Sequence, residues 1–170
     1  MKYNILYVFI FFTFYNISAQ NTTNPHHEKV TDSIRVDELN EFWQKISTTV
    51  KEGNFKSYSS HYHPDAVLVH INKEIVPINK VLKLWKEDFI RTKEGQIDSS
   101  VSFRFSERSG NETTAFEKGI FCYTTVESSG KINDQFAFFE AILIKKNNQW
   151  QMLVEHQKSL ATKEDWETLR

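Results

Sequence analysis

The segment HYHPDAVLVH, from His61 to His70, holds three of the chain's six histidines. Imidazole groups at this density indicate a metal site, a proton-transferring group or a strand that carries histidines for structural reasons. A metal site needs three or four ligands in a suitable geometry. Pro64 and a change from helix to strand separate the directions of His61 and His63 from that of His70. The spacing therefore predicts no metal site.

Strand alternation predicts partners for His70. Residues two apart in a strand point to the same side of the sheet. If Phe136 and Phe138 face the concave side, Glu140 faces it too, and His156 does so on the last strand. We therefore expect His70, Glu140 and His156 to converge, where an imidazole beside a carboxylate can act as a general base near neutral pH. A ligand-binding or purely structural polar cluster fits the same pattern, so the sequence leaves catalysis open.

The first half of the chain has the pattern of helices around one hairpin. Apolar residues between Leu39 and Val50 recur at steps of three and four, which predicts an amphipathic helix that ends at Gly53. A short second helix should end at Pro64, and Pro77 should open a third. The expected elements are helices at 39–53, 54–62 and 77–95, with a strand at 66–71.

The second half changes to a period of two. Four strand-like segments are separated by the turn compositions SGNE, SGKIN and KNN, which predicts an antiparallel sheet. These segments are 99–108, 119–128, 134–145 and 149–157. Thr162 with Asp165 three residues later indicates a short terminal helix. Helices followed by long strands imply an α+β domain, in which a curved antiparallel sheet wraps around three helices.

The N-terminus resembles a secretory signal peptide. Lys2 precedes an apolar run from Ile5 to Phe14, and Ala19 stands at the expected cleavage point. The run is shorter than the ~20 residues of a membrane span, so we expect a secreted or periplasmic protein with no membrane attachment after cleavage. The expected divisions are a signal peptide at 1–19, a flexible lead-in at 20–33, one domain at 34–160 and a tail at 161–170.

Composition argues against several other classes of function. The formal net charge is −1 and neither sign forms a long block, which indicates no nucleic-acid partner. The single cysteine, Cys122, lies in the strand-like segment GIFCYTTV and is interpreted as a core residue. No glycine-rich phosphate loop or Ser-His-Asp order is present, so we expect neither nucleophilic catalysis nor a cofactor.

The order of these elements resembles the nuclear transport factor 2-like superfamily, and within it the SnoaL-like and ketosteroid isomerase-like proteins. The matching parts are the turn Gly53-Asn54-Phe55, the HPDAV segment before the first strand and the terminal strand WQMLVEH. Together they span residues 34–160. The resemblance implies a cone-shaped, cystatin-like fold with an apolar pocket. Because this fold hosts isomerases, cyclases, dehydratases, hydrolases and non-catalytic binding modules, it leaves the activity open.

The resemblance also implies candidate catalytic residues. In ketosteroid isomerases a catalytic carboxylate lies four residues after the Ala of an Asp-Ala pair, and the same count from Asp65-Ala66 reaches His70. Their second acid, on the penultimate strand, corresponds to Glu140. The resemblance thus implies isomerase- or lyase-type acid–base chemistry without a cofactor, with His70 as base and Glu140 as acid or orienting partner. The tyrosine of their first helix corresponds to Ile46, which cannot stabilise an oxyanion.

Aromatic side chains complete the expected site. Trp43 and Trp85 lie on the inner faces of their helices, where they form core or, around a ligand, the walls of a pocket. The expected ligand-binding residues are Trp43, Trp85, Phe138, Tyr62 and His156. The expected function is a secreted SnoaL-like domain that binds a small apolar molecule. The alternative is a non-catalytic interaction module that forms a homodimer or binds a protein partner through the outer sheet face, at Ser102, Arg104, Phe121 and Tyr123.

Overall fold

The computed structural model describes residues 25–169, so the expected signal peptide and the first part of the lead-in lie outside the described residues. Its helices are α1 (Pro25–Lys51), α2 (Phe55–Ser60), α3 (Ile78–Lys93) and α4 (Lys163–Thr168). Its strands are β1 (Tyr62–Val69), β2 (Ile75–Pro77), β3 (Ile97–Gly110), β4 (Thr114–Glu127), β5 (Ile132–Lys146) and β6 (Gln149–Ala161).

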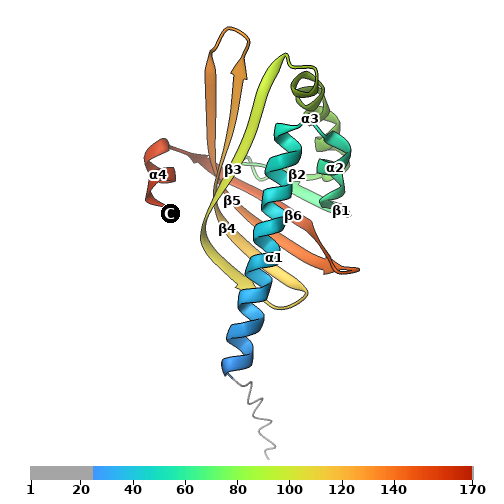
Figure 1. Cartoon of the computed structure of the whole chain (residues 1–170), viewed down its shortest axis with the longest axis vertical. Coiled ribbons are helices and arrows are strands. Elements are labelled where there is room, and N and C mark those ends of the chain that lie inside the picture. Colours follow the sequence, from blue (N-terminus) through green and yellow to red (C-terminus); the bar gives the residue numbers. More distant parts are fainter. Residues whose placement is uncertain (1–24, 170) are drawn as a thin grey trace, which may run out of the picture.

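The strands form one six-stranded sheet in the order β2-β1-β6-β5-β4-β3. All neighbours pair antiparallel except β1 and β6, which pair parallel. The sheet curves around α1, α2 and α3, whereas α4 lies apart from them beyond the long strands (Figure 1). The α+β class with a curved sheet around three helices is therefore confirmed. The parallel pairing was not expected, because it joins segments that are far apart in the sequence.

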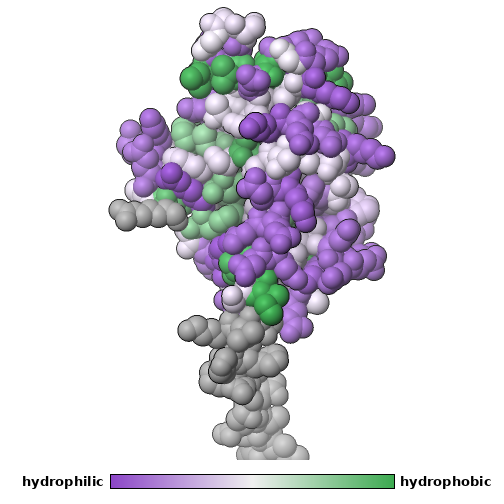
Figure 2. Space-filling model, viewed as in Figure 1, coloured by the Kyte–Doolittle hydropathy of each residue, from purple (hydrophilic) through white to green (hydrophobic). Residues whose placement is uncertain are grey.

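Helix α1 supplies one side of the core, as its apolar spacing predicts. Five of its side chains are at most 6% exposed: Leu39, Phe42, Trp43, Ile46 and Val50. The first four of these pack with the inner side chains of β5 and β6, including Phe139, Leu143 and Met152. Hydrophilic residues cover the side of α1 that faces solvent (Figure 2). The apolar stripe therefore determines how this helix sits against the sheet.

Gly53 allows the chain to turn sharply from α1 into α2. Its φ is +61°, and a Cβ atom there would lie 2.6 Å from both the backbone nitrogen of Lys93 and the carbonyl oxygen of Phe89. The turn thus presses against the end of α3, which only glycine permits. Asn54 then caps α2, because its side-chain oxygen accepts a hydrogen bond from the Ser57 N–H at 3.1 Å.

Two element boundaries differ from the expected ones. The segment at 20–33 was expected to be a flexible lead-in without a helix, whereas α1 begins at Pro25. Helical structure there needs no apolar stripe, because it continues a packed helix and an Asp32–Arg35 ion pair of 2.6 Å supports it. Tyr62 was expected to end a helix, but it opens β1. Pro64 falls where the β1–β6 register shifts, at which a missing N–H is tolerated.

The tail forms the short helix that its capping residues predict. The Thr162 hydroxyl accepts from the Asp165 N–H at 3.0 Å, and the Asp165 carboxylate accepts from the Thr162 N–H at 2.9 Å. Arg104 ties α4 to the outer face of the sheet by donating to the carbonyl oxygens of Trp166 and Leu169 at 2.7 and 2.8 Å. None of the helices within residues 25–169 is long and apolar enough to cross a membrane.

Candidate functional site

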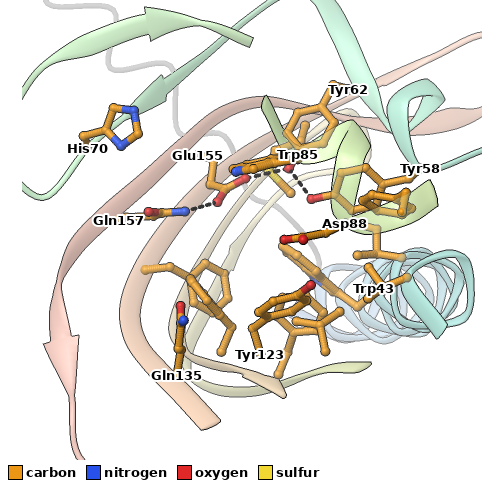
Figure 3. Close-up of a pocket in the computed structure, with 18 residues that line it drawn as sticks. Trp43, Tyr58, Tyr62, His70, Trp85, Asp88, Tyr123, Gln135, Glu155 and Gln157 are labelled. Atoms are coloured by element: carbon orange, nitrogen blue, oxygen red, sulfur yellow. Dashed lines mark hydrogen bonds between the residues drawn. The ribbon is translucent and has the colours of Figure 1, made fainter. Parts of the chain in front are cut away.

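A cavity of about 340 Å³ lies between the concave face of the sheet and the three helices (Figure 3). This volume falls within the range of small-molecule sites. Half of the residues that line it are phenylalanine, tyrosine or tryptophan, including Trp43, Trp85, Phe89, Phe103, Phe121 and Phe139. Trp43 packs at the centre of this wall, with ring centroids 4.5 Å from Phe103 and 5.6 Å from Phe139. The cavity is therefore built from rigid rings contributed by both helices and strands.

The polar centre of the cavity is the carboxyl group of Glu155 on β6. The Tyr62 hydroxyl donates to Glu155 Oε2 at 2.6 Å, and the Gln157 Nε2 group donates to Oε1 at 3.0 Å. The Tyr58 hydroxyl lies 3.1 Å from the Tyr62 hydroxyl. Because the Tyr62 hydrogen is used on Glu155, Tyr58 donates to Tyr62. The result is an ordered chain of hydrogen bonds that ends on one carboxyl group (Figure 3).

Burial sets the protonation of this chain. Removal from water raises the pKa of Glu155, opposed by the hydrogen bonds from Tyr62 and Gln157 and by the positive charge of His70. Burial also raises the pKa of Tyr58 and of Tyr62, and the negative charge of Glu155 adds to both increases. The two hydroxyls therefore remain donors near neutral pH, while Glu155 is the member of the chain that can exchange a proton.

A β-bulge directs Glu155 into the cavity. Ile142 pairs with Val154 and Leu143 pairs with Met152, so Leu153 has no partner on β5. Trp150 and Met152 face inward before the bulge, whereas Glu155 and Gln157 face inward after it. Without the extra residue, strict alternation would have turned His156 inward, as the sequence analysis expected.

Comparison with solved structures adds information about the fold. No protein-family model matches the sequence, and no curated protein matches it. A nuclear transport factor 2-like protein of unknown function from Shewanella oneidensis matches over 72% of this chain and 97% of its own, with 13% identity and a TM-score of 0.56. The chain has the nuclear transport factor 2-like fold.

Two further structures with this fold match the chain. A candidate scytalone dehydratase from Novosphingobium aromaticivorans matches with 9% identity and a TM-score of 0.60, over 79% of this chain and 89% of its own. A protein of unknown function with a cystatin-like fold from Nostoc punctiforme matches with 14% identity and a TM-score of 0.52, over 77% and 94%. The resemblance to the nuclear transport factor 2-like fold, inferred from element order, is confirmed. At such identities the likeness concerns the fold alone.

Within this nuclear transport factor 2-like fold, four of the sequence-predicted site residues line the cavity: His70, Trp43, Trp85 and Tyr62. His70 lies apart from the Tyr62–Glu155 chain, close to the end of β1 (Figure 3). Its position is determined by the turn that follows β1, where its N–H donates to the Glu74 carbonyl oxygen at 2.9 Å. The predicted base thus borders the cavity, but no hydrogen bond joins it to the polar centre.

The expected convergence of His70, Glu140 and His156 is wrong. On β5 the inward residues are Ala137, Phe139 and Ala141, so Glu140 faces the other side of the sheet. There Glu140 accepts from Lys158 Nζ at 2.6 Å and lies 3.3 Å from His156 Nδ1. The Lys158 hydrogen bond is the main reason that the pKa of Glu140 is lowered. Glu140 and His156 therefore meet on the outer face and do not line the cavity.

Other residues also lie on the opposite face of the sheet from the expected one. Phe138, expected in the pocket, borders a second hollow of about 220 Å³ beside α4 on the outer face. Phe121 and Tyr123, expected on the outer face, line the inner cavity. Ser102 and Arg104 do lie outside, and Arg104 is occupied by α4. The phase relative to the core was therefore right for β3 and wrong for β4 and β5, whereas the alternation of β6 is broken by the bulge at Leu153.

The remaining histidines of the opening segment have local partners. His61 Nδ1 lies 2.7 Å from the Ser57 carbonyl oxygen at the end of α2, and burial lowers the pKa of His61. His63 Nδ1 accepts from the Asp65 N–H at 3.2 Å. Across residues 25–169, no group of three or more His, Cys, Asp or Glu side chains is placed to hold a metal ion. These two histidines therefore contribute to the helix-to-strand turn.

The sequence analysis missed Tyr58, Glu155 and Gln157 as site residues. Tyr58 lies within the expected helix at 54–62 and Glu155 within the terminal motif WQMLVEH, but neither was expected to line the pocket. The available signal was a carboxylate directly after the apolar run from Met152 to Val154. The bulge that turns it inward has no signature in the sequence, because Leu153 is an ordinary strand residue.

Glu155→Gln should change how stability depends on pH. A raised pKa means that the folded state holds the proton more tightly than the unfolded state, so this contribution is complete below the unfolded pKa of about 4.3 and is lost as pH rises through the folded pKa. Relative to Glu155→Gln, the wild type should lose stability as pH rises from that value and then level off. Urea unfolding at a series of pH values measures the difference.

Glu140→Gln is the control, because the contribution of Glu140 to stability should depend on pH in the opposite direction. The pKa of Glu140 is lowered, so its contribution is present above the unfolded pKa and is lost as pH falls through the folded pKa. The effect should be small because the site is on the surface. If the free energies of unfolding of Glu155→Gln and the wild type change with pH in the same way, the Glu155 carboxyl group is not desolvated as its place in the cavity implies.

Proposed function

We propose that this protein binds a small, largely apolar molecule in the inner cavity, with Glu155 as the polar anchor. The observation that carries the proposal is a carboxyl group, hydrogen-bonded by Tyr62 and Gln157, inside a cavity with aromatic walls. Ligand sites typically combine such apolar walls with a few convergent polar groups. The signal-like segment at residues 1–19 is the reason that we place this binding in a secreted or periplasmic protein.

The hydrogen-bond chain prepares Glu155 for a ligand. Its two oxygens each accept one protein hydrogen bond, so lone pairs remain for a partner in the cavity. Tyr58 and Tyr62 hold the carboxyl group from one side, and their rings pack on each other with centroids 5.7 Å apart. A ligand would therefore meet a group whose orientation is already determined, which lowers the entropic cost of binding.

Acid–base chemistry without a cofactor is a second candidate function. It is favoured by one observation, the raised pKa of Glu155 at the end of a tyrosine chain. A carboxyl group with a raised pKa can take up or release a proton closer to neutral pH than an ordinary one. In this candidate Glu155, and not Glu140, exchanges the proton with the bound molecule.

Blocking the cavity tests the binding proposal. The full chain is screened by thermal shift against small apolar and carbonyl-containing metabolites, together with Val101→Phe and Ser102→Phe. Val101 lines the cavity, whereas its neighbour Ser102 is exposed on the other face of β3. A true ligand should raise the melting temperature of the wild type and Ser102→Phe but not of Val101→Phe.

The outcomes separate the candidate functions. Equal stabilisation of all three proteins would place the ligand outside the cavity and contradict the proposal. Circular dichroism of the unliganded variants verifies that Val101→Phe is folded. If a ligand is turned over, Glu155→Gln should reduce the rate by about 100-fold or more, as expected for loss of a general acid or base. Unchanged turnover would eliminate the second candidate.

A further inference from the structure

The cavity has an acidic lining without a fixed positive charge. Among the described residues that line it, Asp88 and Glu155 are acidic, His70 is the only basic one, and none is lysine or arginine. Asp88, on α3, pairs with Arg91 at 3.3 Å, but Arg91 lies one helical turn further on and does not line the cavity. The Lys158 ammonium group is held by Glu140 on the outer face. Glu155 therefore has no cationic partner of the protein at hydrogen-bond distance.

Aromatic rings surround the two carboxyl groups. Tyr58 lies next to Tyr62, Trp85 and Phe89, with ring centroids 5.7, 6.2 and 4.7 Å away. Asp88 and Glu155 line the same cavity as these rings, and their negative charges add to the burial that raises the pKa values of Tyr123 and Tyr58, respectively (Figure 3). Tyrosine and tryptophan rings attract cations through their negatively polarised faces. The carboxylates and the faces of the aromatic rings therefore both attract positive charge into the cavity.

We propose that the ligand of this cavity is an organic cation, with an amine or quaternary ammonium head near Glu155 and Asp88 and an apolar body against Trp43 and Phe103. The inference rests on the proposed binding function and adds the charge of the ligand to it. A cation would supply the partner that Glu155 lacks, since a buried carboxylate is stabilised by an opposite charge. A neutral molecule would leave the ionised carboxylate uncompensated.

The sign of the pH dependence distinguishes a cation from a neutral hydrogen-bond acceptor. A cation prefers ionised Glu155, so its affinity should rise with pH until the carboxyl group is ionised. A carbonyl ligand prefers the protonated carboxyl group, so its affinity should fall over the same range. The other titratable groups facing this region are Asp88, Tyr58, Tyr62, Tyr123 and His70. The three tyrosines have raised pKa values and keep their protons.

His70 requires its own control, because it is the only basic residue among the described residues that line the cavity. His70→Asn retains a polar side chain without an ionisable ring. If Glu155 governs the effect, the rise in affinity with pH should persist in His70→Asn and disappear in Glu155→Gln.

Three probes of nearly the same shape test the charge of the ligand. They are para-(hydroxymethyl)phenyltrimethylammonium, the neutral para-tert-butylbenzyl alcohol and the anion para-tert-butylbenzoate. Calorimetry with the full chain measures their dissociation constants between about pH 5 and pH 8.5. The cation should bind at least about tenfold more tightly than the alcohol at the upper pH, and the benzoate most weakly. Glu155→Gln should remove this preference, so that the ratio of the dissociation constants of the alcohol and the cation falls to about one.

Each result has a definite meaning. If the alcohol binds as tightly as the cation, or if affinity for the cation falls with pH, the inference is overturned. The binding function itself survives that result when Val101→Phe abolishes binding of the alcohol. If none of the probes binds, the inference is also overturned, and the metabolite screen with Val101→Phe and Ser102→Phe decides the binding function separately.

Discussion

Glu117→Leu is expected to lower the free energy of unfolding by about 3–5 kcal/mol, because it breaks a buried ion pair. Glu117 is fully buried, and its Oε2 atom accepts from the Arg108 Nε group at 2.8 Å and from the Trp43 Nε1 group at 3.1 Å. Leucine fills a similar volume but leaves the guanidinium and the indole N–H without their acceptor. Urea unfolding at neutral pH measures the loss.

A double variant separates the ion pair from simple packing. In Arg108→Met/Glu117→Leu both charges are absent, so part of the stability should return relative to Glu117→Leu. A loss below about 1 kcal/mol in the single variant would show that Arg108 finds other partners, such as the Asn40 side chain that it already contacts at 2.6 Å. A second consequence concerns the cavity: Glu117 orients the Trp43 ring, so the single variant should also weaken ligand binding.

Phe139→Ala should cost about 3–5 kcal/mol, far more than Phe138→Ala on the same strand. Phe139 is 2% exposed and stands at the junction of the core and the cavity. Its ring packs on those of Trp43, Phe103, Phe105 and Phe121, with centroids 5.6–6.1 Å apart. Removing it deletes these contacts and leaves a void that the surrounding rigid rings cannot fill.

Phe138→Ala is the matched control, since the same substitution is made one residue earlier on the opposite face. Phe138 is only partly buried beside α4. Thermal and urea unfolding of both variants should give clearly different losses, and only Phe139→Ala should change binding in the cavity. Similar losses, or a larger loss for Phe138→Ala, would contradict the observed phase of β5 and favour the alternation first read from the sequence.

The elements of this fold could be predicted because local sequence determines them. The three- and four-residue spacing from Leu39 to Val50 becomes the buried side of α1, and Gly53 ends that region at a positive φ. Thr162 and Asp165 form the predicted capping box of α4. These features depend on residues a few positions apart, so no knowledge of distant contacts is needed.

The candidate site could be predicted only in part. Trp43, Trp85, Tyr62 and His70 line the cavity as expected, although Tyr62 does so from the start of β1 and His70 from the turn that follows β1. Glu155 was missed, since the unpaired Leu153 reverses the alternation of β6. A bulge arises from the mismatch between two paired strands, and neither strand records it alone.

The sequence by itself determined the helices, the strands, their order and thereby the fold class. Only the tertiary structure decided which side of β5 and β6 faces the cavity. On β5 both faces are apolar, with Phe136 and Phe138 outside and Ala137 and Phe139 inside, so hydrophobicity cannot choose between them. The helices cover one face and α4 covers part of the other, and the bulge at Leu153 then selects Glu155 over His156. Long-range packing thus places the carboxyl group of Glu155 in the cavity.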